Sequence, residues 1–229
     1  MENSIYIKKH RTSDKVLYGL IQLSTILSVA LLVVILGYIC MQGLPKLTFS
    51  YLTNVTSVLK GTEGILPNII NTLYMIVVTL LIACPIGIGG AIYLNEYATN
   101  KFFVKIISFT TEVLAGIPSI IYGLFGMLFF GEFLQLGYSI LTGALTLAIM
   151  ILPIIARNTQ VALEAVPKSY REAALGMGAT KWYMIRTVLL PSSILGILTG
   201  IILAIGRIVA ESAALLFTAG SMAFLPKNL

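Results

Sequence analysis

Long stretches of this chain carry no charged residue, and their length limits the folds that the chain can adopt. A helix needs about 20 apolar residues to cross a bilayer core about 30 Å thick. Charge is absent from residues 16–45, 64–95 and 133–156, while residues 106–131 and 187–210 contain only Glu112 and Arg207. These runs predict five membrane-spanning helices, near residues 17–40, 68–94, 106–130, 138–156 and 187–209.

The composition agrees with an all-α integral membrane protein. Hydrophobic residues make up 58% of the 229 residues and charged residues only 10%, which is too little charge for the surface of a water-soluble domain. Histidine occurs once, at His10, so the sequence offers no histidine-based metal site, and no cofactor is predicted.

The distribution of Lys and Arg predicts the orientation of these helices. With a cytoplasmic N-terminus, eleven of the fifteen basic residues fall in inner segments, three fall in outer segments and Arg207 lies within a helix. The positive-inside rule therefore predicts a cytoplasmic N-terminal segment at 1–16 and a multi-pass protein of the cell (inner) membrane. This topology and the anionic inner leaflet explain the net charge of +6, so no nucleic-acid partner is predicted.

The inner loop at 157–186 differs from the other loops in being long and rich in charge, Ala and Gly. Pro167 fits the first turn of a helix, and Gly176 and Gly178 mark the end of that helix. Thr180 can cap a second helix. A short helix, a glycine turn and another helix beneath the membrane form a docking platform; the alternative is an amphipathic interfacial loop.

Within this loop the sequence resembles the EAA signature of binding-protein-dependent ABC importer permeases, which reads E-A-A, three residues, G, nine residues, I, any residue, L-P. The matching residues are Glu172-Ala173-Ala174, Gly178 and Val188-Leu189-Leu190-Pro191, and only Val188 departs from the pattern. The resemblance implies a type I ABC importer permease fold whose loop sits in a groove of a partner ATPase. It assigns Glu172, Ala173, Ala174, Gly178 and Pro191 to ATPase coupling.

The chain contains no G-x-x-x-x-G-K-[ST] phosphate loop, so ATP hydrolysis by that route belongs to another polypeptide. The chain is therefore interpreted as a transporter subunit and not as an enzyme. The partners that the resemblance implies are a dimer of ATP-binding subunits, a homologous permease subunit, an extracytoplasmic binding protein and membrane lipid.

Two further segments resemble phosphate-specific permease subunits of the PstA type, whose sister subunit is called PstC. They are residues 114–126, with the wording L-A-G-I-P-S-I-I-Y-G-L-F-G, and residues 211–219, with E-S-A-A-L-L-F-T-A. The resemblance covers about residues 65–220 and implies a permease core at 65–229 behind a first helix at 17–40. Phosphate is the predicted substrate, with sulfate or molybdate as the alternative.

The chain departs from the family at two places. At 210, 212 and 214 it has Ala, Ser and Ala where the family pattern has Gly, Thr and Pro. It also stops at Leu229, whereas the family continues into a sixth spanning helix, which predicts a fragment or a truncated reading frame, with an inactive remnant as a third alternative.

Arg207 and Glu211 are the predicted residues of the translocation pathway. An ionisable side chain in mid-helix is costly in a membrane, and Glu211 follows four residues later on the same face. The resemblance assigns an Arg and a Glu here to the pathway, and a guanidinium suits phosphate oxygens. The alternative is a structural ion pair. Glu112 is interpreted as an interfacial residue, and the Gly196–Gly200 pair as a helix-packing surface.

A secondary transporter energised by an ion gradient is the alternative from a different class. It would need inverted repeats and intramembrane carboxylates, and the sequence shows no internal repeat.

Overall fold

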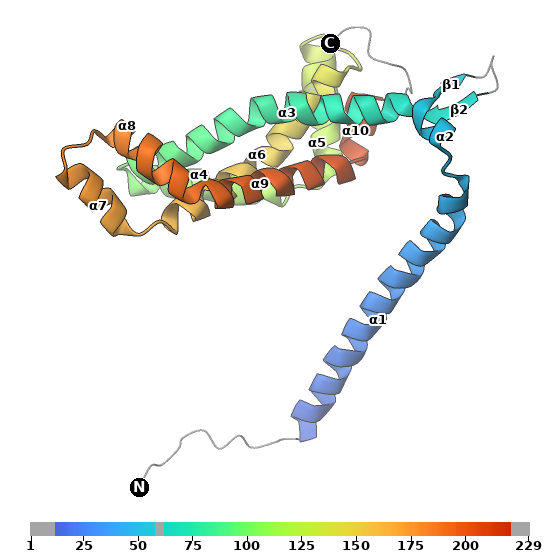
Figure 1. Cartoon of the computed structure of the whole chain (residues 1–229), viewed down its shortest axis with the longest axis horizontal. Helices are drawn as coiled ribbons and strands as arrows, with labels where there is room; N and C mark the ends of the chain where they lie inside the picture. The colour runs from blue at the N-terminus through green and yellow to red at the C-terminus, as the bar shows by residue number, and fades with distance from the viewer. Residues whose placement is uncertain (1–11, 58–61, 221–229) are drawn as a thin grey trace. The chain divides into compact units, whose positions relative to one another are not determined.

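The computed structural model describes residues 12–57 and 62–220 (Figure 1). The backbone divides into two compact units, residues 1–64 and 65–229, and each is described by itself. Most of the predicted cytoplasmic segment 1–16 lies outside the described residues, as do Lys60 and the chain end at Leu229.

The first unit is dominated by α1 (Thr12–Gly43), whose large apolar side chains are exposed along its length. A helix that is apolar on all sides belongs in lipid or against other helices, so α1 suits a membrane span. A short 3₁₀ turn, η1 (Leu44–Lys46), and α2 (Phe49–Thr53) follow. The strands β1 (Val55–Ser57) and β2 (Thr62–Ile65) pair into a two-stranded sheet, in which Thr56 Oγ1 donates to the carbonyl of Gly64 at 2.7 Å.

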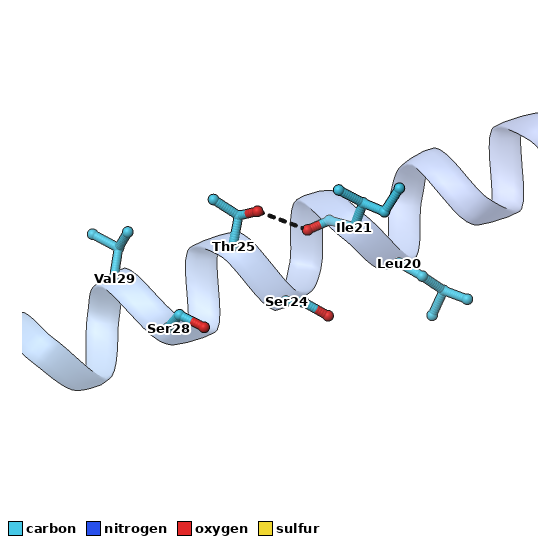
Figure 2. A pocket seen from close by; sticks show the side chains of 6 residues that line it. All are labelled: Leu20, Ile21, Ser24, Thr25, Ser28 and Val29. Atoms are coloured by element: carbon cyan, nitrogen blue, oxygen red, sulfur yellow. Dashed lines mark hydrogen bonds between the residues drawn. The ribbon is translucent and has the colours of Figure 1, made fainter. Parts of the chain in front are cut away.

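Hydroxyl side chains interrupt the apolar surface of α1 near its middle (Figure 2). Thr25 Oγ1 donates to the carbonyl of Ile21 at 2.9 Å, as Figure 2 shows. A hydroxyl that bonds within its own helix is compatible with a lipid environment. The shallow hollow beside Ser24 and Ser28 is lined by this single helix, so it forms no enclosed binding site.

Three long helical segments form the core of the second unit (Figure 1). They are α3 (Leu66–Ile92), which continues through the π-helical turn η2 (Tyr93–Tyr97), α6 (Ile140–Glu164), and α9 (Leu190–Ala210). The helix α6 contacts both of the others, and its Leu147, Ile151 and Ile155 are completely buried. Their spacing of four residues gives α6 one continuous apolar stripe toward its neighbours.

Small residues bring these helices close together. A Cβ atom at Gly196 of α9 would lie 2.5 Å from the Cβ of Ala162 on α6, and one at Gly200 would lie 2.7 Å from the Cβ of Asn158. Membrane helices associate through such close backbone approach because lipid offers no hydrophobic drive between them. The predicted packing role of the Gly196–Gly200 pair is therefore confirmed.

The predicted spanning helix at 106–130 is not one continuous helix, because the structure contains two helices bent by 98° relative to each other. They are α4 (Lys101–Ala115) and α5 (Ser119–Gly126), which continues through the π-helical turn η3 (Met127–Phe133). Pro118 disfavours helical geometry in the residue before it, which ends α4. Tyr122 OH donates to the carbonyl of Leu114 at 2.7 Å, and the N–H of Ile117 donates to the same carbonyl at 3.2 Å. The described residues thus contain four continuous candidate spans, or five if the bent pair counts as one.

Two predicted helix boundaries also need correction. The predicted helix 138–156 continues to Glu164, so Arg157 lies in α6 rather than in the loop. The last long segment begins at Lys181, as α8 (Lys181–Met184) and the π-helical turn η4 (Ile185–Leu189) lead directly into α9. Hydropathy missed these turns because they carry charged side chains while continuing the backbone of the spans.

A final helix, α10 (Ala213–Thr218), was not predicted and packs against α5. A Cβ atom at Gly123 of α5 would lie 2.8 Å from the Cα of Ala214. Two glycines of the 114–126 segment therefore serve helix contact: Gly123 meets α10, and Gly126 meets Thr146 of α6.

We expect Gly196→Ala to destabilise the second unit by about 1–3 kcal/mol, because the added methyl overlaps Ala162. Gly206→Ala on the same helix is the matched control, since a Cβ atom there meets nothing within 4 Å. That control should be neutral or stabilising by up to about 1 kcal/mol. Thermal unfolding of the purified protein in detergent measures both; equal unfolding temperatures for the two variants would contradict this packing.

Candidate functional site

The segment between α6 and α8 forms the predicted helix, glycine turn and second helix. Pro167 directly precedes α7 (Lys168–Gly176). The N–H of Gly178 donates to the carbonyl of Leu175 at 3.0 Å, and the N–H of Ala179 donates to that of Ala174 at 3.1 Å. These two bonds form a Schellman motif, which requires a left-handed residue, and Gly178 has φ +83°. The Thr180 hydroxyl accepts from the N–H of Tyr183 at 3.3 Å and starts α8, as predicted.

The residues of the EAA signature point in different directions. Ala174 is buried, 5% exposed, in an apolar cluster with Leu163, Met184 and Leu189. Its small side chain therefore serves packing within this chain, whereas the sequence reasoning placed it toward a partner. Glu172, Ala173 and Gly178 are exposed. Pro191 is also exposed, in the first turn of α9.

Large apolar side chains stand on the exposed surface of this loop. Tyr170 is 52% exposed, Leu175 47% and Met177 85%. Exposed apolar groups clustered beside polar ones are typical of protein interaction surfaces. The exposed loop surface, defined here as Tyr170, Glu172, Ala173, Leu175 and Met177, is therefore suited to contact a partner.

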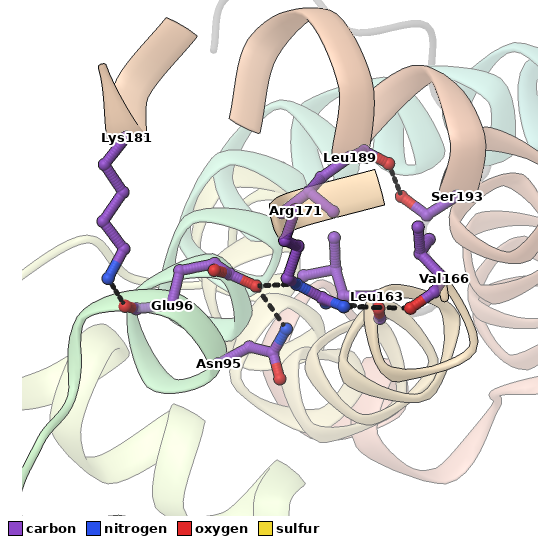
Figure 3. Close-up of polar contacts among 8 residues, drawn as sticks. All are labelled: Asn95, Glu96, Leu163, Val166, Arg171, Lys181, Leu189 and Ser193. Carbon is purple, nitrogen blue, oxygen red and sulfur yellow. Dashed lines mark hydrogen bonds and ion pairs between the residues drawn. The ribbon is translucent and has the colours of Figure 1, made fainter. Parts of the chain in front are cut away.

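Arg171 holds α7 against two other helices (Figure 3). Its Nε donates to Glu96 Oε1 of η2 at 3.1 Å. One terminal nitrogen donates to the carbonyl of Leu163, in the last turn of α6, at 2.8 Å, and the other to the carbonyl of Val166, two residues past that helix, at 2.9 Å. The side chain of Glu96 is 7% exposed and that of Arg171 is 19% exposed, so the contacts are largely shielded from water.

The second helix of the loop contacts the same part of η2. Lys181 Nζ donates to the backbone carbonyl of Glu96 and lies over the ring of Tyr97, 5.0 Å from its centroid. Asn95 Nδ2 donates to Glu96 Oε1 at 2.9 Å (Figure 3). Sequence reasoning missed Glu96 and Arg171 as functional candidates. The available signal was that Glu96 is the only acidic residue of the basic turn 95–105.

Arg207 and Glu211 form the expected ion pair, with a guanidinium nitrogen 3.5 Å from Glu211 Oε2. Arg207 lies in the last turn of α9 and not in mid-helix, and Glu211 follows the helix in an extended conformation. A cation there is stabilised by the C-terminal end of the helix dipole. The side chain of Arg207 is 46% exposed, whereas that of Glu211 is 4% exposed.

The buried carboxylate also fixes the start of the next helix. Glu211 Oε1 accepts from the backbone N–H of Ala214 at 3.1 Å, so its two oxygens contact different partners. A cavity of about 320 Å³ adjoins Glu211 and is lined on the α3 side by Asn68, Asn71 and Thr72. The carboxylate thus lies where α9, α10 and a polar part of α3 meet.

Residues 84–228 match the family described as the binding-protein-dependent transport system inner membrane component. The chain belongs to this family.

The permease is also similar to individual transport proteins. The "Probable ABC transporter permease protein YqgI" of Bacillus subtilis strain 168 is 40% identical, over 92% of this chain and 71% of that protein. The "Phosphate transport system permease protein PstA" of Haemophilus influenzae is 35% identical, over 96% of this chain and 77% of that protein. A structure of the MetNI methionine ABC transporter in an inward-facing conformation matches with a TM-score of 0.60 and 23% identity, over 66% of this chain and 72% of the other.

These similarities confirm the predicted class. The permease has the type I ABC importer permease fold and is a multi-pass, non-enzymatic inner-membrane component of an ABC transporter. The chain breaks between α9 and α10 at Glu211 and Ser212 without the proline of the family pattern at 214. Ala214 instead supplies the N–H that Glu211 accepts, and a proline has no N–H to donate.

Another cavity, of about 240 Å³, lies between α4 and α6 of the permease. Its lining includes Glu112, Arg157 and the side chain of Asn158, which packs on Gly200 in the apolar part of α9. The interfacial role predicted for Glu112 stays a prediction.

We expect Gly178→Ala to strain the loop of the permease by about 1–2 kcal/mol, because L-residues are disfavoured at positive φ. Gly176→Ala is the matched control, since it lies in α7 and a Cβ atom there meets nothing within 4 Å. Protease cleavage within residues 165–180 of the purified permease should become faster in Gly178→Ala only. Equal cleavage of both variants would contradict the turn geometry.

Proposed function

We propose that this permease carries phosphate across the membrane, together with a homologous PstC-type permease subunit, an extracytoplasmic phosphate-binding protein and a dimer of ATP-binding subunits. The observation that supports phosphate best is the half-exposed Arg207 beside the buried Glu211. The similarity to PstA of Haemophilus influenzae supports the same substrate class.

Arg207 has the chemistry to bind an oxyanion. The ion pair with Glu211 involves one terminal nitrogen of a guanidinium that carries five N–H donors. The donors of a planar guanidinium match two oxygens of a phosphate, and hydrogen bonds between charged groups are stronger than neutral ones. Because Arg207 is 46% exposed, a passing anion can reach it.

Glu211 limits the affinity of Arg207 for phosphate. Its carboxylate is held by the N–H of Ala214 and remains next to Arg207 when no anion is bound. An entering phosphate therefore competes with an existing charge partner, which weakens its net binding and allows its release. In the alternative, the pair only holds α9 and α10 together, and the experiment below separates the two.

The exposed loop surface is the proposed contact with the ATP-binding subunit. Glu172 supplies a charge, Ala173 permits close approach, and Met177 and Leu175 supply apolar contact area. Gly178 and Pro191 support this surface by shaping the turn and the start of α9. Ala174 supports it from below, since it packs inside the chain.

This contact requires the loop to lie in the cytoplasm, which the Lys and Arg distribution supports. We expect a cysteine introduced at Lys168 to be protected from a membrane-impermeant reagent added to intact cells, and one at Lys60 to react. Permeabilised cells provide the control, in which both positions react. Labelling of Lys168 but not Lys60 in intact cells would reverse the proposed orientation.

Phosphate transport is tested in cells from which this gene is deleted and then restored. Restoration should recover uptake of radioactive phosphate, and excess unlabelled phosphate should compete better than sulfate or molybdate. Competition by sulfate or molybdate instead would assign the permease to another oxyanion, and no recovery would agree with an inactive remnant.

The role of the ion pair is tested with the double variant Arg207→Gln, Glu211→Gln. We expect normal assembly with the ATP-binding subunit but phosphate uptake lower by about 10- to 100-fold, the loss corresponding to charge-assisted hydrogen bonds of about 1.5–3 kcal/mol. Lys105→Gln, which removes an exposed charge from α4, is the control. Full uptake in the double variant would show that the pair is structural.

A further inference from the structure

The helix α3 touches both functional regions of the permease. At one end it continues into η2, whose Glu96 contacts Arg171 and Lys181 of the loop at 157–186, called the coupling loop below. Near its other end, Asn68, Asn71 and Thr72 line the cavity that adjoins Glu211. The segment from Leu66 to Tyr97 has 32 residues, which corresponds to a helix about 48 Å long.

We propose that Arg171 and Glu96 are positioning residues that tie α7 to α3, so that movement of α7 by the ATP-binding subunit changes the cavity beside Glu211. This proposed connection between α7 and α3 rests on the proposed function in one respect: it takes α7 as the contact with the ATP-binding subunit. It adds a direct route from that contact to the translocation pathway.

The contacts of Arg171 are unusual for a residue in a loop helix. Its donors go to three acceptors: the carboxylate of Glu96 in η2, the carbonyl of Leu163 in the last turn of α6, and the carbonyl of Val166, two residues past the end of α6. A cation is favoured at the C-terminal end of a helix by the helix dipole. Arg171 therefore fixes α7 to η2 and to the end of α6 simultaneously.

The carboxylate of Glu96 is a site where little movement is tolerated. Its side chain is 7% exposed, so Arg171 must balance its charge, and Arg171 and Asn95 must supply the hydrogen bonds that water cannot. Separating a buried carboxylate from its cation is strongly unfavourable. If α7 is displaced, Glu96 and the end of α3 are therefore expected to move with it.

The other side of the loop reinforces this connection. Lys181 of α8 contacts the carbonyl of Glu96 and the ring of Tyr97, so both helices that flank the glycine turn are attached to η2. Farther along, α3 packs tightly on α6, where a Cβ atom at Gly87 would lie 2.9 Å from a methyl carbon of Ile155. Close packing resists local bending and favours movement of the helices as units.

Glu96→Gln is the most informative substitution. It removes the charge that pairs with Arg171 while keeping the size of the side chain and the backbone carbonyl that Lys181 contacts. Glu164→Gln is the matched control, because Glu164 lines the same polar groove as Glu96 but is exposed. Arg171→Gln removes the other partner and completes a double-mutant cycle.

The readout is the reactivity of a cysteine at Thr72, an exposed residue of α3 that lines the Glu211 cavity. The assembled transporter is used, with Cys40 and Cys84 replaced by alanine, and labelling is compared without nucleotide and with ATP plus vanadate. We expect several-fold different rates in the two states for the parent and for Glu164→Gln. In Glu96→Gln the difference should fall at least about threefold, while ATP-binding subunits still co-purify.

The double variant should lose no more of this difference than Arg171→Gln alone, because Glu96 acts through Arg171. Arg171→Gln also removes the contacts with the carbonyls of Leu163 and Val166, so its loss can exceed that of Glu96→Gln. A full nucleotide-dependent difference in Glu96→Gln, or additive losses in the double variant, would refute the tie. Loss of co-purification in Glu96→Gln would also refute it, since the pair would then serve docking and not transmission.

This measurement needs no phosphate, so it separates the two proposals. A permease that transports another oxyanion would still show the nucleotide-dependent difference. Conversely, failure of the parent to co-purify with an ATP-binding subunit would refute the proposed function of α7 itself.

Discussion

The packing of α6 between α3 and α9 is the interaction on which the 65–229 unit depends. In lipid, burying an apolar side chain between helices gains no hydrophobic free energy, because the lipid tails are equally apolar. Helices therefore associate through close contact and van der Waals attraction. Gly87, Gly196 and Gly200 supply that contact by bringing α6 within reach of both neighbours. The coupling loop joins α6 to the α8–α9 segment, and α10 follows α9, so the placement of both candidate sites follows from this core.

The guanidinium groups of Arg171 and Arg207 both lie near helix C-terminal ends. Arg171 of α7 donates to the carbonyl of Leu163 in the last turn of α6 and to that of Val166 just past it, and Arg207 lies in the last turn of α9. Each is also paired with a buried carboxylate, Glu96 or Glu211. The difference is exposure: Arg171 is 19% exposed and Arg207 46% exposed. The first is therefore suited to hold helices together, and the second retains a surface that an anion can reach.

The coupling loop shows why a signature motif does not assign one role to all of its residues. Glu172 and Ala173 are exposed, whereas Ala174 packs against Leu163 and Leu189. Neighbouring positions on a helix point about 100° apart, so a run of small residues serves two surfaces. The exposed positions are the ones that the proposed partner would contact, and the buried alanine lets α7 lie close against its own bundle.

Local patterns were sufficient to predict the membrane class, the approximate spans and the helix–turn–helix of the loop, because hydropathy, Pro167, Gly178 and Thr180 act through local physics. They also identified Arg207 and Glu211, which are four residues apart. Only the tertiary structure revealed the 98° break between α4 and α5, the inward side of Ala174, and the pairing of Arg171 with Glu96, 75 residues away. Such long-range pairing depends on which helices pack together, and no local pattern in one sequence specifies that.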